Sequence, residues 1–190
     1  MPTARHTICA IAALVLVSTS GAGFAQDDSQ LTAEQLAAKF IAQQATRGLV
    51  IAPSGTAADA TAVDGAALPE DTTYVALDPS AQVNFQIKFA FDSAALAANE
   101  VAKLDTLCEV IKASDIAQFK IIGHTDASGT DSYNQNLSLL RAEEVKRYLV
   151  NDCGVPDGKL VATGMGEAFP MDPDNPRAEV NRRVEFQVGS

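Results

Sequence analysis

The sequence predicts an α+β domain over residues 80–190, in which two helices pack on one face of a small mixed sheet. Three observations predict this class. Apolar and polar residues alternate in the segments that open and close this region, as in strands with one buried face. Two longer segments between them carry apolar residues at helical spacing. Two short apolar segments complete the order β, α, β, α, β, β, and roughly 110 residues suffice for one hydrophobic core.

The expected elements are, in order, a strand at 83–91, a helix at 96–113, a strand at 118–122, a helix at 133–151 and strands at 159–163 and 180–188. Asp92 and Ser93 interrupt the alternation of the first strand and end it. A turn at 123–126 follows the second strand, and Gly154 with Pro156 ends the second helix. The apolar stripe of that helix is expected to consist of Leu137, Leu140, Val145, Tyr148 and Leu149.

Residues 26–79 are rich in Ala, Thr, Gly and Asp and contain one helical patch. Thr32 and Gln35 have the spacing of a capping box at its start. Its apolar residues are Leu31, Leu36, Phe40 and Ile41. A helix of about ten residues is marginal alone. The rest of the segment has too few large apolar residues for a core, so we expect a flexible linker before the domain.

Residues 1–25 have the pattern of a cleaved secretory signal peptide. Arg5 and His6 precede an uncharged apolar run at 8–17, and small residues follow it. A membrane anchor is the alternative, but the run is shorter than the roughly 18–20 apolar residues that span a bilayer. Cys9 lacks the leucine and small residues that precede a lipidated cysteine, so we expect no lipid anchor. The mature chain is therefore expected to be exported and to contain no transmembrane segment.

Cleavage would remove Arg5 and no acid, which lowers the number of Lys and Arg from 14 to 13 against 24 Asp and Glu and leaves a net charge of −11. Nucleic acid and anionic lipid repel such a chain, so we expect neither as a partner. Cys108 and Cys153 remain, and an exported bacterial protein meets an oxidising compartment. We expect one disulfide between them, because they fall in two helices that should lie side by side. Two buried thiols are the alternative.

The segment GHTDASGTDSYNQNLSLLRA, residues 123–142, sets Asp126 and Arg141 fifteen residues apart across a strand, a loop and a helix. An ammonium group pairs with a carboxylate, and a carboxylate pairs with the two-pronged guanidinium group. The two residues can therefore hold a zwitterion that carries both groups on one carbon. The alternatives are an Asx turn at Asp126 and a solvated surface position for Arg141.

This segment resembles the signature of the OmpA-like peptidoglycan-binding domain, which occurs in OmpA, Pal and MotB-type proteins. FAFDSA at 89–94 and NRRVEF at 181–186 match two further motifs of that family, and the resemblance runs from about residue 82 to residue 188. It implies a non-catalytic periplasmic protein that binds the meso-diaminopimelate of the peptidoglycan stem peptide in the Gram-negative cell envelope and tethers the protein or the outer envelope to the cell wall. Asp126 would bind the ammonium group and Arg141 the carboxylate. A position peripheral to the outer membrane is compatible with this role.

The resemblance adds further candidate residues around that pair. Asp92 and Ser93 would flank the peptide stem, although Asp92 is equally suited to cap a helix. Ser128 lies in the polar loop, and Asn134 fits either a helix cap or a hydrogen-bond donor to the ligand. Strand alternation sends Arg182 to the apolar side and Arg183 away, so at most one of them should share the side of the ligand. We favour Arg182, because the resemblance implies that the arginine directly after the asparagine is the one used. A salt bridge to the acidic loop is its alternative. The loop at 176–180 carries proline for the glycine of the family and one extra residue, which leaves its path open.

Other functions have weaker support. His124, Asp126 and Ser128 or Ser138 could be drawn as a hydrolytic triad, but residues two apart in a tight turn rarely share one proton path, and no nucleophile elbow is present. His124 is the only histidine after residue 25, and the cysteines are 45 residues apart, so we expect no metal and no cofactor. A scaffold that binds an envelope protein through residues 26–79 is the second candidate function.

Overall fold

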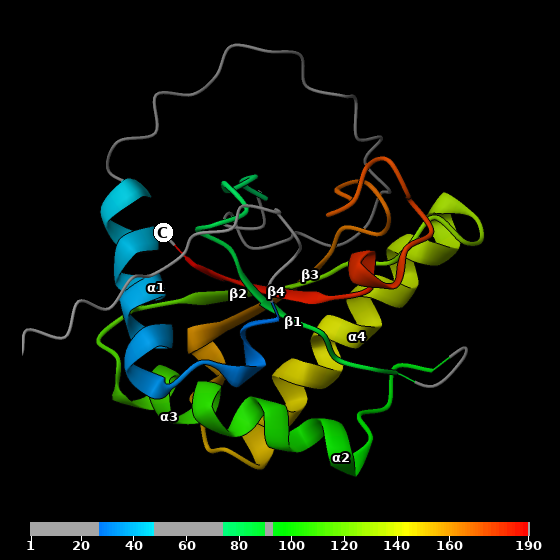
Figure 1. The fold of residues 1–190 in the computed structure, drawn as a ribbon. Coiled ribbons are helices and arrows are strands. Elements are labelled where there is room, and N and C mark those ends of the chain that lie inside the picture. Colours follow the sequence, from blue (N-terminus) through cyan, green and yellow to red (C-terminus); the bar gives the residue numbers. More distant parts are fainter. Residues whose placement is uncertain (1–26, 48–73, 90–92, 190) are drawn as a thin grey trace, which may run out of the picture.

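The computed structural model describes residues 27–47, 74–89 and 93–189. The expected signal peptide, most of the expected linker and Asp92 lie outside the described residues. The elements are α1 (Ala33–Arg47), β1 (Val83–Phe85), α2 (Ala98–Val101), α3 (Asp105–Ala113), β2 (Phe119–Gly123), α4 (Asp131–Asn151), β3 (Leu160–Gly164) and β4 (Val184–Val188) (Figure 1). A 3-10 turn, Ala102–Leu104, joins α2 to α3.

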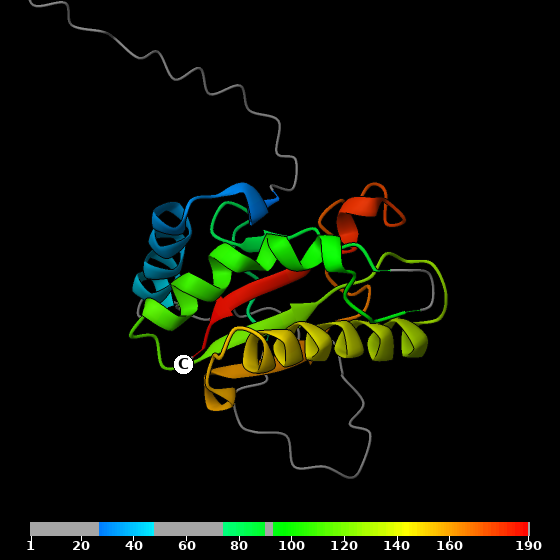
Figure 2. The same ribbon diagram turned by 90° about the horizontal axis from the view of Figure 1, so that it is seen from below.

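The described strands form one mixed sheet in the order β1-β4-β2-β3. β4 is antiparallel to both β1 and β2, whereas β2 and β3 are parallel. Phe186 of β4 lies opposite Val83 on one side and Ile121 on the other. The helices α3 and α4 cover the same face of the sheet, as both views show (Figure 2). The predicted α+β class and mixed sheet are confirmed.

Two strands are shorter than the alternation predicts. β1 ends at Phe85, where the Ile87 backbone N–H donates to the Phe85 carbonyl 3.0 Å away and turns the chain. Ile87 is nevertheless buried, so the alternation at this position reports burial beyond the end of the strand. β4 begins only at Val184, because residues 179–181 form a 3-10 turn. The Asn181 side-chain amide holds that turn by donating to the carbonyl oxygens of Asn175 and Pro176.

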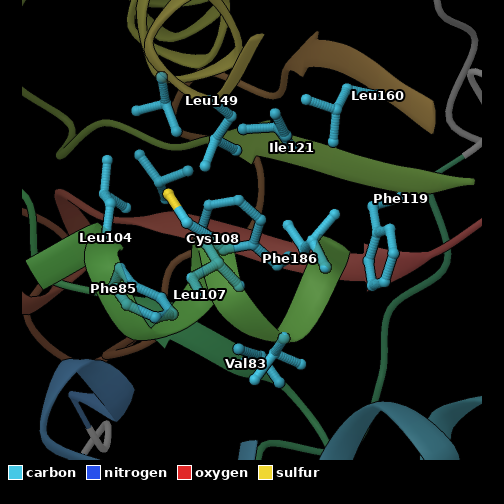
Figure 3. Close-up of a cluster of buried hydrophobic side chains, with 14 of the residues drawn as sticks. Val83, Phe85, Leu104, Leu107, Cys108, Phe119, Ile121, Leu149, Leu160 and Phe186 are labelled. Carbon is cyan, nitrogen blue, oxygen red and sulfur yellow. The ribbon is translucent and has the colours of Figure 1, made fainter. Parts of the chain in front are cut away.

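The main core lies between the sheet and the helices (Figure 3). Phe85 and Phe186 meet edge to face across β1 and β4, with ring centroids 5.3 Å apart. A disulfide links Cys108 of α3 to Cys153, just beyond α4, across a Cα separation of 5.9 Å. The predicted bridge is therefore present, and it joins the two helices that cover the sheet.

The helix α1 packs on this same core. Leu36 and Phe40 are buried, and the Phe40 ring lies edge to face with Phe119, with centroids 5.0 Å apart. Gln43 accepts a hydrogen bond from the Val188 backbone N–H, 2.9 Å away, at the end of β4. The capping box of Thr32 is present, but the helix has 15 residues rather than about ten. We propose that residues 27–47 fold together with residues 80–189.

Replacement of Phe40 tests this coupling. Phe40→Ala should lower the free energy of unfolding of the whole chain by about 3–5 kcal/mol, because it empties a buried aromatic site. The neighbouring residue provides the control. Ile41 is 63% exposed, so Ile41→Ala should change the free energy of unfolding by less than about 0.5 kcal/mol. Urea unfolding followed by circular dichroism measures both. Equal, small effects would mean that α1 contributes nothing to the domain.

The amino-terminal half of α4 approaches the sheet at two glycines that pair across β2 and β3, Gly123 and Gly164. A Cβ atom on Gly164 would lie 2.5 Å from the Leu139 backbone nitrogen and 2.6 Å from the Ser138 hydroxyl. The Ser138 hydroxyl donates to the Gln135 carbonyl and accepts from the Gly166 N–H, each at 2.8 Å. The helix backbone therefore rests almost directly on the strands.

This approach changes the expected stripe of α4. Its buried residues are Asn134, Ser138, Arg141, Ala142, Val145 and Leu149. Leu140, which the apolar stripe was expected to bury, is 52% exposed. The strands leave no room for a leucine where Ser138 lies against the paired glycines, so the first half of the helix buries polar and small residues.

Gly164→Ala should therefore lower the free energy of unfolding by at least about 1–3 kcal/mol, since the methyl group meets helix backbone that cannot move aside alone. Gly158 is the matched control, because a Cβ atom there meets nothing within 4 Å. Gly158→Ala should leave stability unchanged or raise it by less than about 1 kcal/mol. Thermal and urea unfolding of both variants give the comparison, and equal stabilities would contradict the packing described.

Candidate functional site

The loop that follows β2 is held in place by three backbone hydrogen bonds. The N–H groups of His124, Thr125 and Ala127 donate to the carbonyl oxygens of residues 183, 166 and 176, at 3.0, 2.8 and 3.0 Å. The loop thus lies between the segment that follows β3 and the segment that precedes β4. Pro176, in the part that departs from the family pattern, supplies one of these acceptors.

Asp126 is nearly buried in this loop and makes two charge-assisted contacts. One carboxylate oxygen accepts from the Arg182 guanidinium at 2.7 Å, and the other accepts from the Ser128 N–H at 3.0 Å. The second contact is the Asx turn that the sequence left open. Burial acts to raise the pKa of Asp126, but the hydrogen bonds from Arg182 and Ser128 outweigh it and hold the pKa below 3.8. The carboxylate is therefore ionised at neutral pH.

The side chain of Asn134 also holds the Asp126 loop in place. Its side-chain amide donates to the Asp126 carbonyl at 3.3 Å and to the Glu167 carboxylate. The cap of α4 is Thr130, whose hydroxyl accepts from the Tyr133 N–H, so Asn134 is not the helix cap. Glu167 was not expected at this position, and its sequence surroundings carry no signal for it.

Arg141 reaches the site from the next turns of α4. It is 8% exposed, its guanidinium carbon lies 4.9 Å from the centre of the Phe89 ring, and its Nε donates to the Ser93 carbonyl at 3.4 Å. Among the described residues, no carboxylate lies within 4 Å of this guanidinium. Burial lowers the pKa of Arg141, and nearby Arg182 acts in the same direction while Tyr133 and Asp126 oppose it. An arginine nonetheless stays charged, so Arg141 is a cation with an incomplete set of partners.

A cavity of about 390 Å³ opens beside these residues. Four of its lining residues are cationic and one is a carboxylate. The lining consists of Gln86, Ile87, Lys88, Phe89, His124, Arg141, Glu179, Arg182 and Arg183. The local charge therefore opposes that of the whole chain and favours an anionic group.

The candidate residues reach this cavity in different ways. Arg141 and Arg182 line it directly, and Asp126 is joined to it through Arg182. Ser128 contributes its backbone N–H to Asp126. Ser93 contributes its carbonyl to Arg141, while its hydroxyl accepts from the Ala95 N–H.

Behind the cavity lies a buried polar cluster on the face of the sheet away from α3 and α4. His124 Nε2 lies 3.3 Å from a Glu185 carboxylate oxygen, which also accepts from the Tyr74 hydroxyl at 3.2 Å. Arg183 donates to the Asn84 side chain at 3.1 Å. The sequence places His124 in the turn but does not predict this cluster. The one sequence feature that points to this cluster is the alternation of β4, which puts Glu185 on the face opposite the apolar side of the strand.

Burial lowers the pKa of His124 below 6.5, although the hydrogen-bonding carboxylate of Glu185 opposes this shift. The unfolded chain therefore binds a proton at a higher pH than the folded chain does. The His124 contribution to stability is complete above about pH 6.5 and should fall as the pH drops below it, by at most about 1.4 kcal/mol per pH unit.

His124→Gln should remove this component. Urea unfolding between pH 5 and pH 8 should show a decline toward acid pH in the natural chain and a shallower decline in the variant. The carboxylates titrate mainly below this range, so they affect both curves alike. Identical slopes would show that His124 is not held neutral by burial.

The fold and the cavity define a class of protein, an α+β domain with a cationic binding pocket at the end of a central strand. Residues 88–183, just over half of the 190-residue chain, match the OmpA family. The chain belongs to the OmpA family, as its motifs predict.

Outer membrane porin F of Pseudomonas aeruginosa is 41% identical over 110 residues, which are 56% of this chain and 31% of the porin. Outer membrane protein A of Bordetella avium is 35% identical over 103 residues, 53% of this chain and 52% of that protein. The chain thus spans between about a third and a half of these relatives. The OmpA-like domain of FopA1 from Francisella tularensis superposes with a TM-score of 0.50 at 28% identity, covering 57% of this chain and 71% of that domain.

Two further observations concern the described residues alone. They contain no helix that is both long and apolar enough to cross a bilayer. They also bring together no group of three or more histidine, cysteine or acidic side chains with the arrangement of a metal site.

Proposed function

We propose that this domain binds peptidoglycan without catalysis in the periplasm, and that it tethers the chain to the cell wall. The ligand would be a zwitterionic centre of the stem peptide, such as meso-diaminopimelate. Domains of the OmpA family bind peptidoglycan and anchor envelope components, which supports the assignment. The observation that carries it is the buried guanidinium of Arg141, which lacks a carboxylate partner among the described residues.

The charges around the cavity are suited to such a ligand. Arg141 and Arg182 face one buried carboxylate, Asp126, and both Asp126 and Arg182 act electrostatically on Arg141. A carboxylate that entered would supply the partner that Arg141 lacks. An ammonium on the same carbon would share or replace the Arg182 contact to Asp126. The Arg182 side chain is partly exposed, so it can move without opening the core.

The contacts of the polar side chains favour binding over hydrolysis. The Asp126 carboxylate is engaged by Arg182 and Ser128, and the His124 ring faces Glu185. The Ser138 hydroxyl is engaged by α4 and by Gly166. A triad needs one hydrogen-bonded path through serine, histidine and aspartate, and these contacts direct the three groups elsewhere.

Co-sedimentation with purified Gram-negative sacculi tests the proposal. Natural chain from residue 26 should pellet, whereas Asp126→Asn and Arg141→Gln should weaken binding by roughly tenfold to a hundredfold, as expected for one lost charge-assisted bond. Arg147→Gln is the matched control, because Arg147 lies on the same helix and pairs with Glu144 on the surface, outside the lining of the cavity. It should bind like the natural chain. Circular dichroism must show that all variants are folded.

Sacculi with an amidated diaminopimelate carboxylate provide the second arm. Amidation should weaken binding of the natural chain about as much as Arg141→Gln does, since the same bond is lost. It should therefore weaken binding of the Arg141→Gln variant little further. If the natural chain stays in the supernatant, the domain does not bind the wall. If it pellets and both site variants pellet equally, the wall is bound elsewhere.

A further inference from the structure

A second cavity lies at the other end of the sheet, between α1 and the carboxyl-terminal half of α3. Its volume is about 660 Å³. It is lined by Ala33, Glu34, Ala37, Phe40, Ile41, Gln44, Glu109, Val110, Ala113, Ser114, Asp115 and Ile116. We refer to these residues as the α1–α3 groove. They belong neither to the OmpA-type motifs nor to the cationic cavity.

The floor of the α1–α3 groove is apolar. Phe40, Val110 and Ile116 form it and are themselves buried, so they cannot close it further. Ile41 stands at its edge and is 63% exposed, the most exposed large apolar side chain of the described residues. Burial of its exposed apolar surface in a partner contact would be favourable. The groove therefore offers apolar surface that a side chain from outside can cover.

The rim of the groove is acidic. Glu34, Glu109 and Asp115 line it, all exposed, and no lysine, arginine or histidine does. The charge of the rim therefore selects a partner that carries lysine or arginine beside its apolar residues.

The same charge argues against occupants from this chain. Residues 48–73 contain Asp59, Asp64, Glu70 and Asp71 and neither lysine nor arginine. A second copy would bring a chain with a net charge of −10. Both would set carboxylates against the acidic rim, which is unfavourable.

We propose that the α1–α3 groove binds an amphipathic helix of another protein, with large apolar side chains one turn apart and lysine or arginine beside them. A helix laid in a groove uses apolar anchors at positions i, i+3 or i+4, and i+7. The groove runs along about three turns of α1, from Ala33 to Gln44, which is long enough for such a set of anchors. This surface gives the amino-terminal helix the partner role that its sequence left open.

The position of the groove allows both sites to be occupied together. Ile116 of the groove precedes β2, whereas the Asp126 loop follows the other end of β2 (Figure 1). Five strand residues separate the two ends, a distance of roughly 17 Å. The domain can then hold the wall at one end of the sheet and a partner helix at the other.

Fluorescence anisotropy with a labelled synthetic peptide tests the groove. The probe is an amphipathic helix with leucines at the three anchor positions and lysine or arginine elsewhere, and its control is a scrambled peptide of the same composition. The natural chain from residue 26 should bind the amphipathic peptide at least about tenfold more tightly than the scrambled one. Ile41→Lys should remove this preference, because it deletes the apolar edge and opposes the charge of the peptide.

Ala38→Lys is the matched control, since Ala38 is an exposed residue of α1 outside the groove and the charge change is identical. It should retain the preference. Asp126→Asn should also retain it, which separates this test from wall binding. Equal binding of both peptides, or equal loss in both lysine variants, would overturn the proposal. Sedimentation velocity supplies the last test: a dimer that Ile41→Lys dissociates would make the groove an interface between copies and would also overturn it.

Discussion

The contact of α4 with the paired glycines of β2 and β3 is the constraint on which the candidate site depends. Because Gly123 and Gly164 carry no Cβ atom, the backbone around Ser138 lies against the strands. This close approach brings Asn134 under the Asp126 loop and turns Arg141 toward the cavity. The polar residues of α4 are buried because the helix is too close to the sheet for large apolar ones at this end. At the other end of α4, the Cys108–Cys153 disulfide and the buried Leu149 hold the helix on the core. The polar end therefore stays in place without an apolar core of its own.

The charges at the site are balanced only in part among the described residues. Burial of a guanidinium is unfavourable unless other groups compensate it. Arg141 receives the face of the Phe89 ring and one carbonyl, whereas Arg182 donates to a carboxylate oxygen of Asp126. Arg141 thus remains a cation without a carboxylate partner among the described residues. A zwitterion can complete both pairs, because its ammonium matches Asp126 and its carboxylate matches Arg141.

The sequence predicted the fold class, the order of the elements, the disulfide and the pairing of motifs around Asp126, because these depend on local periodicity and on short motifs. The sequence failed to predict burial that depends on residues far away in the chain. The alternation through Phe89 was interpreted as strand, although Ile87 is buried after the chain has already turned. Leu140 was expected inside because apolar spacing alone cannot show that α4 turns the face of Ser138 and Arg141 toward the sheet. The environment of Phe40, beside Phe119, and the cluster of His124 and Glu185 combine residues far apart in the chain, so no local pattern reveals them.

An acidic chain that binds an anionic polymer needs a local reversal of charge, and the structure separates the two signs. The cationic side chains of the first cavity gather where β2 ends, and the carboxylates of the α1–α3 groove gather before β2 begins. With a net charge of −10, the chain as a whole has no long-range attraction to a polyanion. If the cationic cavity binds the wall as proposed, recognition there would depend on short-range pairing with Arg141 and Asp126, which discriminates by geometry. At the groove the overall charge and the local charge have the same sign, so attraction of a basic helix begins at longer range and the apolar floor selects among the helices that arrive.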